Sequence, residues 1–409
     1  MRAVCGPSSS SWAYNRGMSD VVAIIGGGPA GLAAAATLKP LGLTVRVLEK
    51  AESVGARWRD HYDRLHLHTT RTGSALPGLN IPSAYGRWVK RDDFVAYQEA
   101  YAKHHGIELE TGTTVERVER VERVERVERV ERSGTGWQLT TNKGAIDATY
   151  VIVATGYNNI PHLPAWPGRQ TFTGSLVHSR EYRSGATYKG KKVMVVGTGN
   201  TGAELATDLV EQGAAEVWWS FRTPPVILPR ALAGIATQAF GIMLRPLSPK
   251  IVDPIMAGVG RVFIGNLKKY GLPRATRGGY TAVLEDHVLP ILDVGLVGAI
   301  KRGQVKPVAT ISSFDGKAVV LADDQRLEPD AVIACTGYRT ALDGILGHLG
   351  VLDKDGIPTV SGTAQHEAAP NMYFLGYTNA LSGNLREIAA HARRLANAIG
   401  RSKQLKTGT

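Results

Sequence analysis

Two stretches of the chain share one pattern of apolar and polar positions. Residues 21–50 begin with the apolar run VVAII, pass through a glycine-rich turn into LAAAATL, and end with TVRVLEK. Residues 193–222 repeat this order with VMVV, a second glycine-rich turn, AELATDLVEQG and EVWWSFR. A short apolar run before a glycine turn is typical of a buried parallel strand, and the longer segment after the turn is typical of the crossover helix. The pattern therefore predicts two βαβ units.

The first glycine turn has the spacing Gly26-x-Gly28-x-x-Gly31. Glycine lets such a turn bend tightly, lets the backbone approach a pyrophosphate, and lets the helix pack closely on the strand; the helix N-terminus then faces the phosphates. Glu49 ends the second strand, where a carboxylate accepts hydrogen bonds from the adenosine ribose of FAD or NAD. We expect cofactor contacts from Gly26, Gly28, Pro29, Ala30, Gly31, Glu49 and Lys50.

The second glycine turn, Gly197-x-Gly199-x-x-Gly202, differs from the first at the end of the second strand, the position that distinguishes NADPH from NAD or FAD. Its second strand ends in Ser220-Phe221-Arg222 instead of an acid. An arginine at this place pairs with a 2′-phosphate that a carboxylate would repel, which favours NADPH; an ordinary surface arginine is the alternative. The residues expected at this site are Gly197, Gly199, Asn200, Thr201, Gly202 and Arg222.

Two further apolar runs end alike. VIVATGY at residues 151–157 and AVIACTGY at residues 331–338 each predict a strand that closes the sheet of a dinucleotide-binding unit and turns back over the ligand. The pattern of residues 384–401 predicts a closing helix. From these segments we expect cofactor contacts at Thr155, Gly156, Thr336, Gly337 and Gly376.

Residues 115–132 contain six copies of the triplet Val-Glu-Arg. A period of three buries no single face of a helix or of a strand. Five of the six glutamates precede an arginine by four residues, a spacing that supports an exposed helix by about 0.3 kcal/mol per pair. We therefore expect a solvated helix or a mobile excursion instead of a core element. A tandem expansion within a hairpin loop, between TGTT and WQLTT, is the simplest origin.

Composition narrows the function classes. The 409 residues allow two or three domains, and 48 Lys+Arg against 36 Asp+Glu give a net charge of +12. Residues 222–302 hold 11 basic and four acidic residues, so +7 of this charge lies just after the second glycine turn. That charge favours an anionic cofactor or substrate. The segment contains no nucleic-acid-binding motif, so we expect no nucleic-acid partner.

The cysteines and the apolar runs bear on the compartment. Cys5 and Cys335 match no metal, disulfide or redox spacing, which disfavours a disulfide reductase and predicts no metal site. No apolar run reaches the ~18 residues of a membrane span, and the Ser-rich start lacks a signal core. The expectation is a cytoplasmic protein with no membrane span, in which residues 1–17 form a disordered extension.

The segment FTGSLVHSREYR, residues 172–183, lies between the two glycine turns and resembles the FxGxxxHxxxY(K/R) fingerprint of class B flavin-dependent monooxygenases. The resemblance is nearest to the YUCCA-type enzymes and their bacterial relatives, and runs from about residue 21 to residue 400. Its further segments are YDRLHLHT at 62–69, DDFVAYQEAYAKHHGI at 92–107, ILPR at 227–230, GLPR at 271–274, LPILDVG at 289–295 and DAVIACTGYR at 330–339.

This resemblance implies an α/β fold with two Rossmann-like dinucleotide-binding domains. The FAD domain would comprise residues 18–165 and 331–409, with the NADPH domain, residues 166–330, inserted between them. It also implies that the fingerprint residues organise the junction of the two domains, with His178 a weaker candidate for a general base, and that Trp58 in the flavin-side loop either contacts the cofactor or simply packs. The fingerprint positions are Phe172, Gly174, His178 and Tyr182.

The implied activity is an NADPH- and FAD-dependent monooxygenase that oxygenates a small molecule with O₂ through a C4a-(hydro)peroxyflavin, the flavin carrying the chemistry. A YUCCA-like enzyme would decarboxylate an α-keto acid such as indole-3-pyruvate oxidatively, and the basic middle segment favours such an acid. Three alternatives stay open: a broad N- or S-oxygenating flavin monooxygenase, an NADPH:flavin oxidoreductase without oxygen transfer, and a nucleotide-sensing flavoprotein. The oligomeric state is not indicated.

Overall fold

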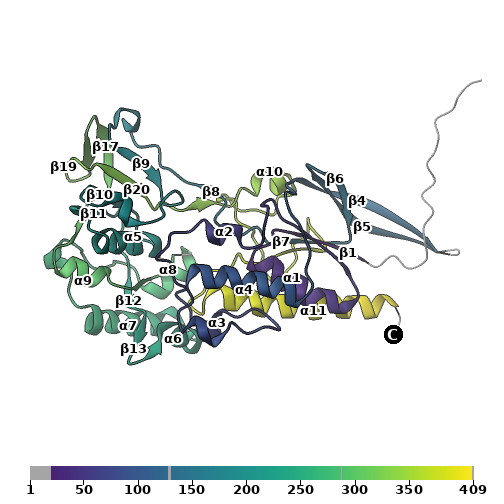
Figure 1. Cartoon of the computed structure of the whole chain (residues 1–409). Helices are drawn as coiled ribbons and strands as arrows, with labels where there is room; N and C mark the ends of the chain where they lie inside the picture. The colour runs from purple at the N-terminus through teal and green to yellow at the C-terminus, as the bar shows by residue number, and fades with distance from the viewer. Residues whose placement is uncertain (1–19, 128–129, 287, 408–409) are drawn as a thin grey trace, which may run out of the picture.

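The computed structural model describes residues 20–127, 130–286 and 288–407. The molecule is an elongated α/β protein with two parallel five-stranded sheets, one toward each end (Figure 1). The expected extension at residues 1–17 and Cys5 lie outside the described residues. No helix in the described ranges is long and apolar enough to cross a membrane.

The first sheet contains the first predicted βαβ unit. Its order is β22 (Met372–Phe374), β7 (Tyr150–Val153), β1 (Val21–Ile25), β2 (Thr44–Leu48) and β3 (Leu109–Glu110), all parallel. Alternate residues of β1 enter different cores: Val22 and Ile24 face the helices, whereas Ala23 and Ile25 face an antiparallel sheet. Both faces are covered, which explains why the strand reads as an unbroken apolar run.

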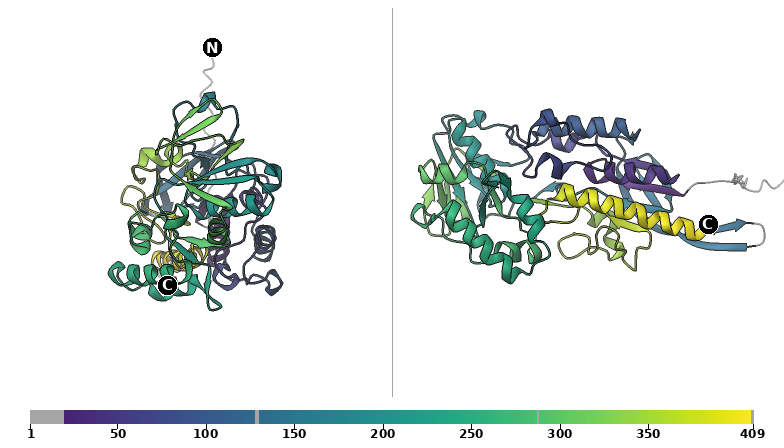
Figure 2. Two further views of the ribbon diagram at one scale, coloured as in Figure 1. Left: turned by 90° about the vertical axis from the view of Figure 1, so that its left-hand side faces the viewer. Right: turned by 90° about the horizontal axis from the view of Figure 1, so that it is seen from below.

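Three helices cover one face of this sheet: α1 (Pro29–Leu38), α4 (Arg91–His104) and α11 (Asn384–Thr407). Helix α11 lies along α1 in two views (Figures 1 and 2). The alanine-rich α1 is buried along nearly its whole length, because the short side chains let sheet and helix approach it from both sides. The closing helix predicted from residue 384 is confirmed and continues to Thr407.

The Val-Glu-Arg repeat forms a hairpin, not a helix. Strands β4 (Val115–Val127) and β5 (Val130–Thr141) pair antiparallel, and β6 (Gly144–Ala148) completes the sheet. A bulge between Val115 and Arg117 offsets the alternation, so Val115 and Val118 both enter the core beside Trp137. The hairpin between TGTT and WQLTT is confirmed, but the repeat lies largely in its strands and not in its loop. The expected helix is wrong, and at the base of the hairpin the expected exclusion from the core is wrong as well.

The second sheet holds the second βαβ unit. Its order is β16 (Val305–Val308), β11 (Glu216–Ser220), β10 (Lys192–Val196), β20 (Ala331–Ala334) and β9 (Ser175–His178), all parallel. Helices α5 (Asn200–Glu211) and α9 (Leu296–Lys301) cover one face. The antiparallel strands β17 (Ile311–Asp315), β18 (Ala318–Leu321) and β19 (Arg326–Leu327) cover the other.

One expected boundary is corrected by this sheet. Strand β20 hydrogen-bonds to β10 on one side and to β9 on the other, so residues 331–334 belong to the second sheet. The expected boundary between residues 330 and 331 assigns them instead to the domain of the first sheet. The chain crosses between the sheets at β8 (Ile160–Pro161) and returns at β21 (Tyr338–Arg339), and these two short strands pair antiparallel. The return to the first sheet therefore begins near residue 338.

A helical segment follows the second βαβ unit along the lower edge of Figure 1. It consists of β12 (Ile227–Pro229), β13 (Ala231–Leu232), β14 (Ile235–Ala236), α6 (Thr237–Leu244), α7 (Pro249–Val259), the π-helical η5 (Gly260–Ile264), α8 (Gly279–Glu285) and β15 (Ile291–Asp293). The 3₁₀ turn η6 (Lys268–Tyr270) also lies in this segment, between η5 and α8. Short elements elsewhere are α2 (Ala56–Arg59), α3 (Arg71–Ser74), α10 (Asp343–Leu346) and the 3₁₀ turns η1 (Lys39–Leu41), η2 (Ser83–Tyr85), η3 (Arg169–Thr171), η4 (Gly185–Tyr188) and η7 (Gly347–Leu349).

Candidate functional site

The first glycine turn joins β1 to α1, and its three glycines have different surroundings. A Cβ on Gly26 would lie 2.7 Å from the Ala154 carbonyl oxygen, and one on Gly31 would lie 1.9 Å from the Gly26 oxygen. A Cβ on Gly28 would meet nothing within 4 Å. The outer two glycines therefore allow the turn and the packing, while Gly28 leaves an open place against the backbone.

Helix α1 begins at this open place. Gly28 is its N-cap, Pro29 is its first residue, and no side chain caps it. Uncapped N–H groups and the helix dipole together attract an anion such as a pyrophosphate. Gly376 lies beside the same turn, because a Cβ there would be 3.3 Å from the Ala30 Cβ. Gly28, Ala30 and Gly376 thus lie together at the start of α1.

Glu49 follows β2 and closes over the turn. One of its carboxylate oxygens accepts a hydrogen bond from the Gly27 N–H at 2.6 Å, and the other accepts from the Ala51 N–H at 2.9 Å. The carboxylate is thereby fixed at the carboxyl end of the strand. Each carboxylate oxygen can accept a further bond, so Glu49 retains the capacity to bind a ribose hydroxyl.

A cationic cavity of ≈ 490 Å³ opens next to Glu49. Lys50 Nζ donates to Asn159 Oδ1 at 3.2 Å, and Arg57 and Arg180 each donate to the Asn159 carbonyl oxygen at 3.2 Å. Burial, followed by Arg57, lowers the pKa of Lys50; burial, followed by Arg180, lowers the pKa of Arg57. These three cations outnumber the two carboxylates of the lining, Glu49 and Asp60, so the cavity favours an anion. The sequence predicted Lys50 here, but not Arg57, Asn159 or Arg180.

The second glycine turn joins β10 to α5 and repeats the first. A Cβ on Gly197 would lie 2.3 Å from the Cys335 carbonyl oxygen, and one on Gly202 would lie 2.2 Å from the Gly197 oxygen. A Cβ on Gly199, the N-cap of α5, would meet nothing within 4 Å. The same division of roles therefore holds at both turns: two packing glycines and one open position at a helix N-terminus.

The remaining predicted residues of the second turn have distinct positions. The Asn200 side chain accepts from the Leu292 N–H at 2.8 Å and donates to the Pro290 carbonyl oxygen at 3.3 Å, so it anchors β15 to α5. Thr201 contacts the buried Tyr62 hydroxyl. Arg222 lies two residues past β11 and is exposed. Its guanidinium is thus open to a ligand at the carboxyl end of this strand.

A buried polar cluster joins α5 to the segment after α2. Glu204, 3% exposed, lies 2.6 Å from His68 Nε2, and it also contacts the Tyr62 hydroxyl. Burial, followed by the charge of Glu204, raises the pKa of Tyr62. Arg64 adds a bidentate pair to Glu211 at 2.9 and 2.8 Å. These contacts fix the second βαβ unit against the first part of the chain, and the sequence did not predict them.

The fingerprint residues His178 and Tyr182 form hydrogen bonds within the protein. His178 Nε2 donates to the Gly337 carbonyl oxygen at 3.0 Å, while Nδ1 accepts from the Arg180 N–H at 3.1 Å. Both ring nitrogens of this buried histidine thus bind backbone, and burial lowers its pKa. Tyr182 donates to Asp208 at 2.6 Å. This geometry favours a neutral, positioning His178 over a general base.

The other predicted residues are placed as follows. Thr155 Oγ1 lies 2.7 Å from the Tyr377 hydroxyl, and Thr336 donates to the His162 carbonyl oxygen. Gly156 and Gly337 adopt φ of +72° and +82°, and follow the ends of β7 and β20. A Cβ on Gly174 would lie 2.5 Å from the Phe172 ring. Trp58 packs edge-to-face on Phe94 at 4.5 Å. These residues shape the two strand ends, and Trp58 is at least a packing residue.

The start of α11 meets the helical segment. Gln238 of α6 donates to the Ser382 carbonyl oxygen at 2.6 Å and accepts from the Thr70 N–H at 2.9 Å. Arg245 pairs with the buried Glu387 at 2.9 Å. The buried Asn384 Oδ1 has no hydrogen-bond partner in the described structure. An unpaired buried acceptor at a helix start marks a place where a ligand group can bind.

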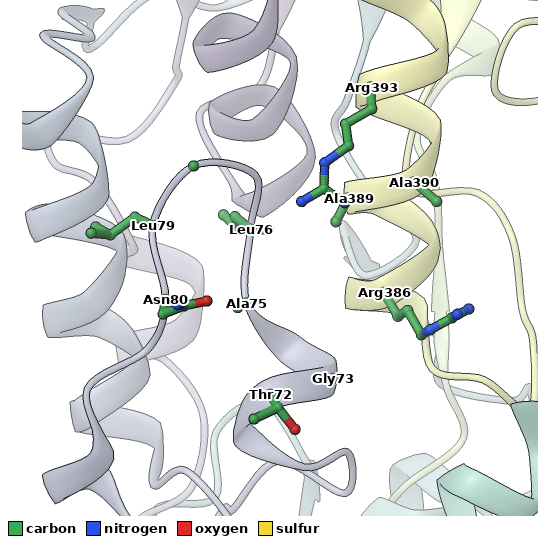
Figure 3. A pocket seen from close by; sticks show the side chains of 11 residues that line it. Thr72, Gly73, Ala75, Leu76, Leu79, Asn80, Arg386, Ala389, Ala390 and Arg393 are labelled. Atoms are coloured by element: carbon green, nitrogen blue, oxygen red, sulfur yellow. The ribbon is translucent and has the colours of Figure 1, made fainter.

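A separate cavity of ≈ 340 Å³ lies farther along α11 (Figure 3). Arg393 points across it toward the loop after α3, whereas Arg386 points away from that loop. Small apolar side chains, among them Ala389 and Leu76, line it between the polar groups. None of the predicted cofactor residues lines this cavity.

His61 gives the stability of the protein a pH dependence. Burial lowers its pKa to about 4, whereas an unfolded histidine titrates near 6.5. The unfolded chain then binds the proton more tightly, so stability present above about pH 6.5 is lost as the pH falls toward 4. By about pH 5 the loss is at most about 2 kcal/mol. We expect His61→Gln to lower the dependence of the melting temperature on pH between about 7.5 and 5; an unchanged dependence contradicts this.

Comparison with known proteins agrees with this geometry. Residues 19–346 match the family model described as flavin-binding monooxygenase-like. The chain is 35% identical over 361 residues to the indole-3-pyruvate monooxygenase YUCCA1 of Oryza sativa subsp. japonica, covering 87% of this chain and 86% of the relative. It is 32% identical over 357 residues to the probable indole-3-pyruvate monooxygenase YUCCA3 of Arabidopsis thaliana, covering 87% and 81%.

Solved structures extend the comparison to the fold. A flavin monooxygenase from Stenotrophomonas maltophilia superposes with a TM-score of 0.69 at 24% identity, covering 94% of this chain and 99% of that one. The family model and the curated relatives together identify a flavoprotein oxidoreductase. The chain belongs to the flavin-binding monooxygenase family, as its fingerprint segment predicted, and it is a flavin-dependent monooxygenase.

Proposed function

We propose that the first glycine turn holds FAD and the second holds NADPH, in two Rossmann-like domains of which the NADPH domain is inserted into the FAD domain. The observation that carries this assignment is the contrast between two equivalent turns. The strand beside the first ends in the fixed carboxylate of Glu49, and the strand beside the second ends near the exposed cation of Arg222. A carboxylate suits a ribose diol, and a guanidinium suits a 2′-phosphate.

The residues fit both cofactors. Gly28 and Gly199 leave open places at uncapped helix starts, and the cavity with Lys50, Arg57 and Arg180 adds positive charge beside the first. Gly28, Glu49 and the cations of this cavity would hold FAD, which would supply the hydride-accepting and O₂-activating chemistry. The protein binds both nucleotides, and the pairs His68–Glu204 and Arg64–Glu211 hold the two units in a fixed arrangement.

For the substrate we propose an aryl α-keto acid of the indole-3-pyruvate type. Two observations support it: the activity named for relatives at 32–35% identity, and the excess of seven positive charges in residues 222–302. In the reaction, the keto acid, O₂, NADPH and a proton give the one-carbon-shorter acid, CO₂, water and NADP⁺. One oxygen atom enters the new carboxylate and the other leaves as water.

The test is NADPH-dependent O₂ consumption with matched substrates. We expect indole-3-pyruvate and phenylpyruvate to stimulate turnover, with CO₂ released in proportion to NADPH oxidised. Amines and thioethers of similar size should stimulate little. Turnover with amines or thioethers but never with aryl-pyruvates sinks the keto-acid proposal and leaves an N- or S-oxygenating enzyme. NADPH oxidation that no substrate stimulates would indicate an oxidoreductase without oxygen transfer.

A further inference from the structure

Exposed apolar side chains are concentrated in the helical segment. Within the part of the chain that the structure describes, every large apolar side chain that is exposed, apart from Ile160, lies between Ile235 and Leu289. Single exposed apolar residues are ordinary on protein surfaces, whereas a cluster marks an interaction site. The segment is therefore a candidate docking surface.

Helix α7 and the following η5 carry the centre of this cluster. Val252 and Met256 point inward and pack with Leu228 and Tyr280. The outward side is also apolar, with Ile251 50% and Ile255 43% exposed on α7. In η5, Val262 and Phe263 are 75% and 56% exposed. A helix that only covered the core would have polar residues on its outer side.

Helix α6 and the turn after it extend the cluster toward α7. Met243 is 63% exposed and Leu247 is 38% exposed. We name the surface formed by Met243, Leu247, Ile251, Ile255, Val262 and Phe263 the apolar face. In Figure 1 its helices α6 and α7 lie together along the lower edge of the molecule, away from the hairpin of β4 and β5.

Basic residues accompany the apolar face. Lys250 and Arg261 are exposed; Lys250 directly precedes Ile251 on α7, and Arg261 directly precedes Val262 and Phe263 in η5. Neither residue forms an ion pair in the described structure. Asp253, which lines a cavity together with Arg261, accepts hydrogen bonds from the backbone N–H and hydroxyl of Thr281. Their charges are therefore available to a partner. NADPH at Arg222 accounts for only part of the +7 in this region.

We propose that the apolar face docks on the surface of an anionic lipid bilayer. Exposed apolar side chains interspersed with Lys and Arg fit the boundary between acyl chains and acidic headgroups. A second copy of the chain fits poorly, because a two-fold contact would bring the Lys250 and Arg261 pairs of both copies together. The contact is peripheral, since no helix in the described ranges can span a bilayer.

Two contacts connect the docked surface to the body of the protein. Gln238 of α6 binds the Ser382 carbonyl oxygen, and Arg245 binds the buried Glu387 at the start of α11. These contacts therefore fix the position of the apolar face relative to α11. The inference does not depend on the substrate or on the assignment of the two nucleotides.

Vesicle flotation of the flavin-loaded full chain tests the proposal. We expect binding to vesicles of phosphatidylcholine mixed with phosphatidylserine, weakened by salt, and little binding to phosphatidylcholine alone. The double variant Val262→Ser/Phe263→Ser should lower the partition coefficient at least about tenfold. Lys250→Glu/Arg261→Glu should lower it by a similar factor. The matched control Lys317→Glu/Lys354→Glu changes the net charge equally, at exposed positions outside the helical segment, and should bind nearly as the parent does.

Three results would overturn the proposal. The first is no binding to acidic vesicles, or equal binding to neutral ones. The second is an equal loss in the control variant, which would indicate a response to net charge and not to this face. The third is that the parent protein forms a dimer which the double variant Val262→Ser/Phe263→Ser no longer forms, while that variant binds vesicles as the parent does. This result would mean that the apolar face contacts a second copy of the chain. Flavin content and circular dichroism show whether each variant is folded.

Discussion

Gly28→Ala yields a folded protein that no longer retains flavin. The backbone at Gly28 has φ −77° and ψ −173°, which alanine adopts without strain. Its Cβ would meet no protein atom within 4 Å, so the added methyl obstructs only a ligand that approaches the start of α1. We expect flavin affinity to fall by about 100-fold or more, equivalent to about 3 kcal/mol. Flavin absorbance per mole of purified protein and the melting temperature of the apoprotein measure the two effects.

Two companion variants make this result specific. Gly199→Ala has an equally open Cβ position at the second turn and should retain flavin while losing NADPH affinity. Gly31→Ala places a Cβ 1.9 Å from the Gly26 oxygen and should destabilise the fold itself. A Gly28→Ala protein with full flavin content would show that the cofactor does not approach this turn.

Arg222→Ala removes the preference for NADPH over NADH. A guanidinium–phosphate contact contributes about 1.5–3 kcal/mol, so we expect kcat/KM for NADPH to fall by about 10–100-fold. The same parameter for NADH should stay nearly constant, because NADH lacks the 2′-phosphate. Steady-state kinetics with both nucleotides provide the comparison within a single protein.

Two outcomes bear on the assignment of Arg222. Arg222→Glu should extend the effect, because a carboxylate repels the 2′-phosphate and accepts bonds from a free ribose diol. Lys317→Ala, at an exposed position in the β17–β18 turn, controls for the loss of one surface cation. Equal losses with NADPH and NADH in Arg222→Ala would mean that Arg222 supports the fold or the common part of the nucleotide.

The βαβ units could be predicted because their signals are local. In VVAII and VMVV the whole strand is apolar, since both faces of each sheet are covered. The last glycine of each motif is demanded by a contact only a few residues away, as between Gly31 and the Gly26 oxygen. The structure confirms both units and both turns.

The repeat shows where a periodic pattern misleads. Its period of three does not match the period of two by which side chains alternate along a β-strand. One bulge at the base of the hairpin nevertheless places Val115 and Val118 on the same buried side. The sequence carries no sign of that bulge, and pairing with β5 decides the conformation through contacts that the triplets themselves do not encode. Local Glu–Arg pairs, worth a few tenths of a kcal/mol each, are too weak to oppose a continuous antiparallel ladder.

Groups that meet across long sequence separations were also missed. Arg57, Asn159 and Arg180 come from three segments and converge only when the two crossings between the sheets are in place. Glu204 is one of several polar residues of α5, and nothing in the local sequence sets it apart. Its partner His68 lies far away in the sequence. The predicted domain boundary near residue 330 was wrong for a related reason. The sequence of an apolar strand does not indicate which of two sheets the strand joins.

The most direct test of the proposed reaction follows the oxygen atoms of O₂ into the product. The purified protein, reduced by NADPH under ¹⁸O₂, is supplied with indole-3-pyruvate, and the product acid is analysed by mass spectrometry. We predict one ¹⁸O atom in the new carboxylate and one NADPH consumed per CO₂ released. Product without the isotope, or NADPH consumption that yields only hydrogen peroxide, would contradict it.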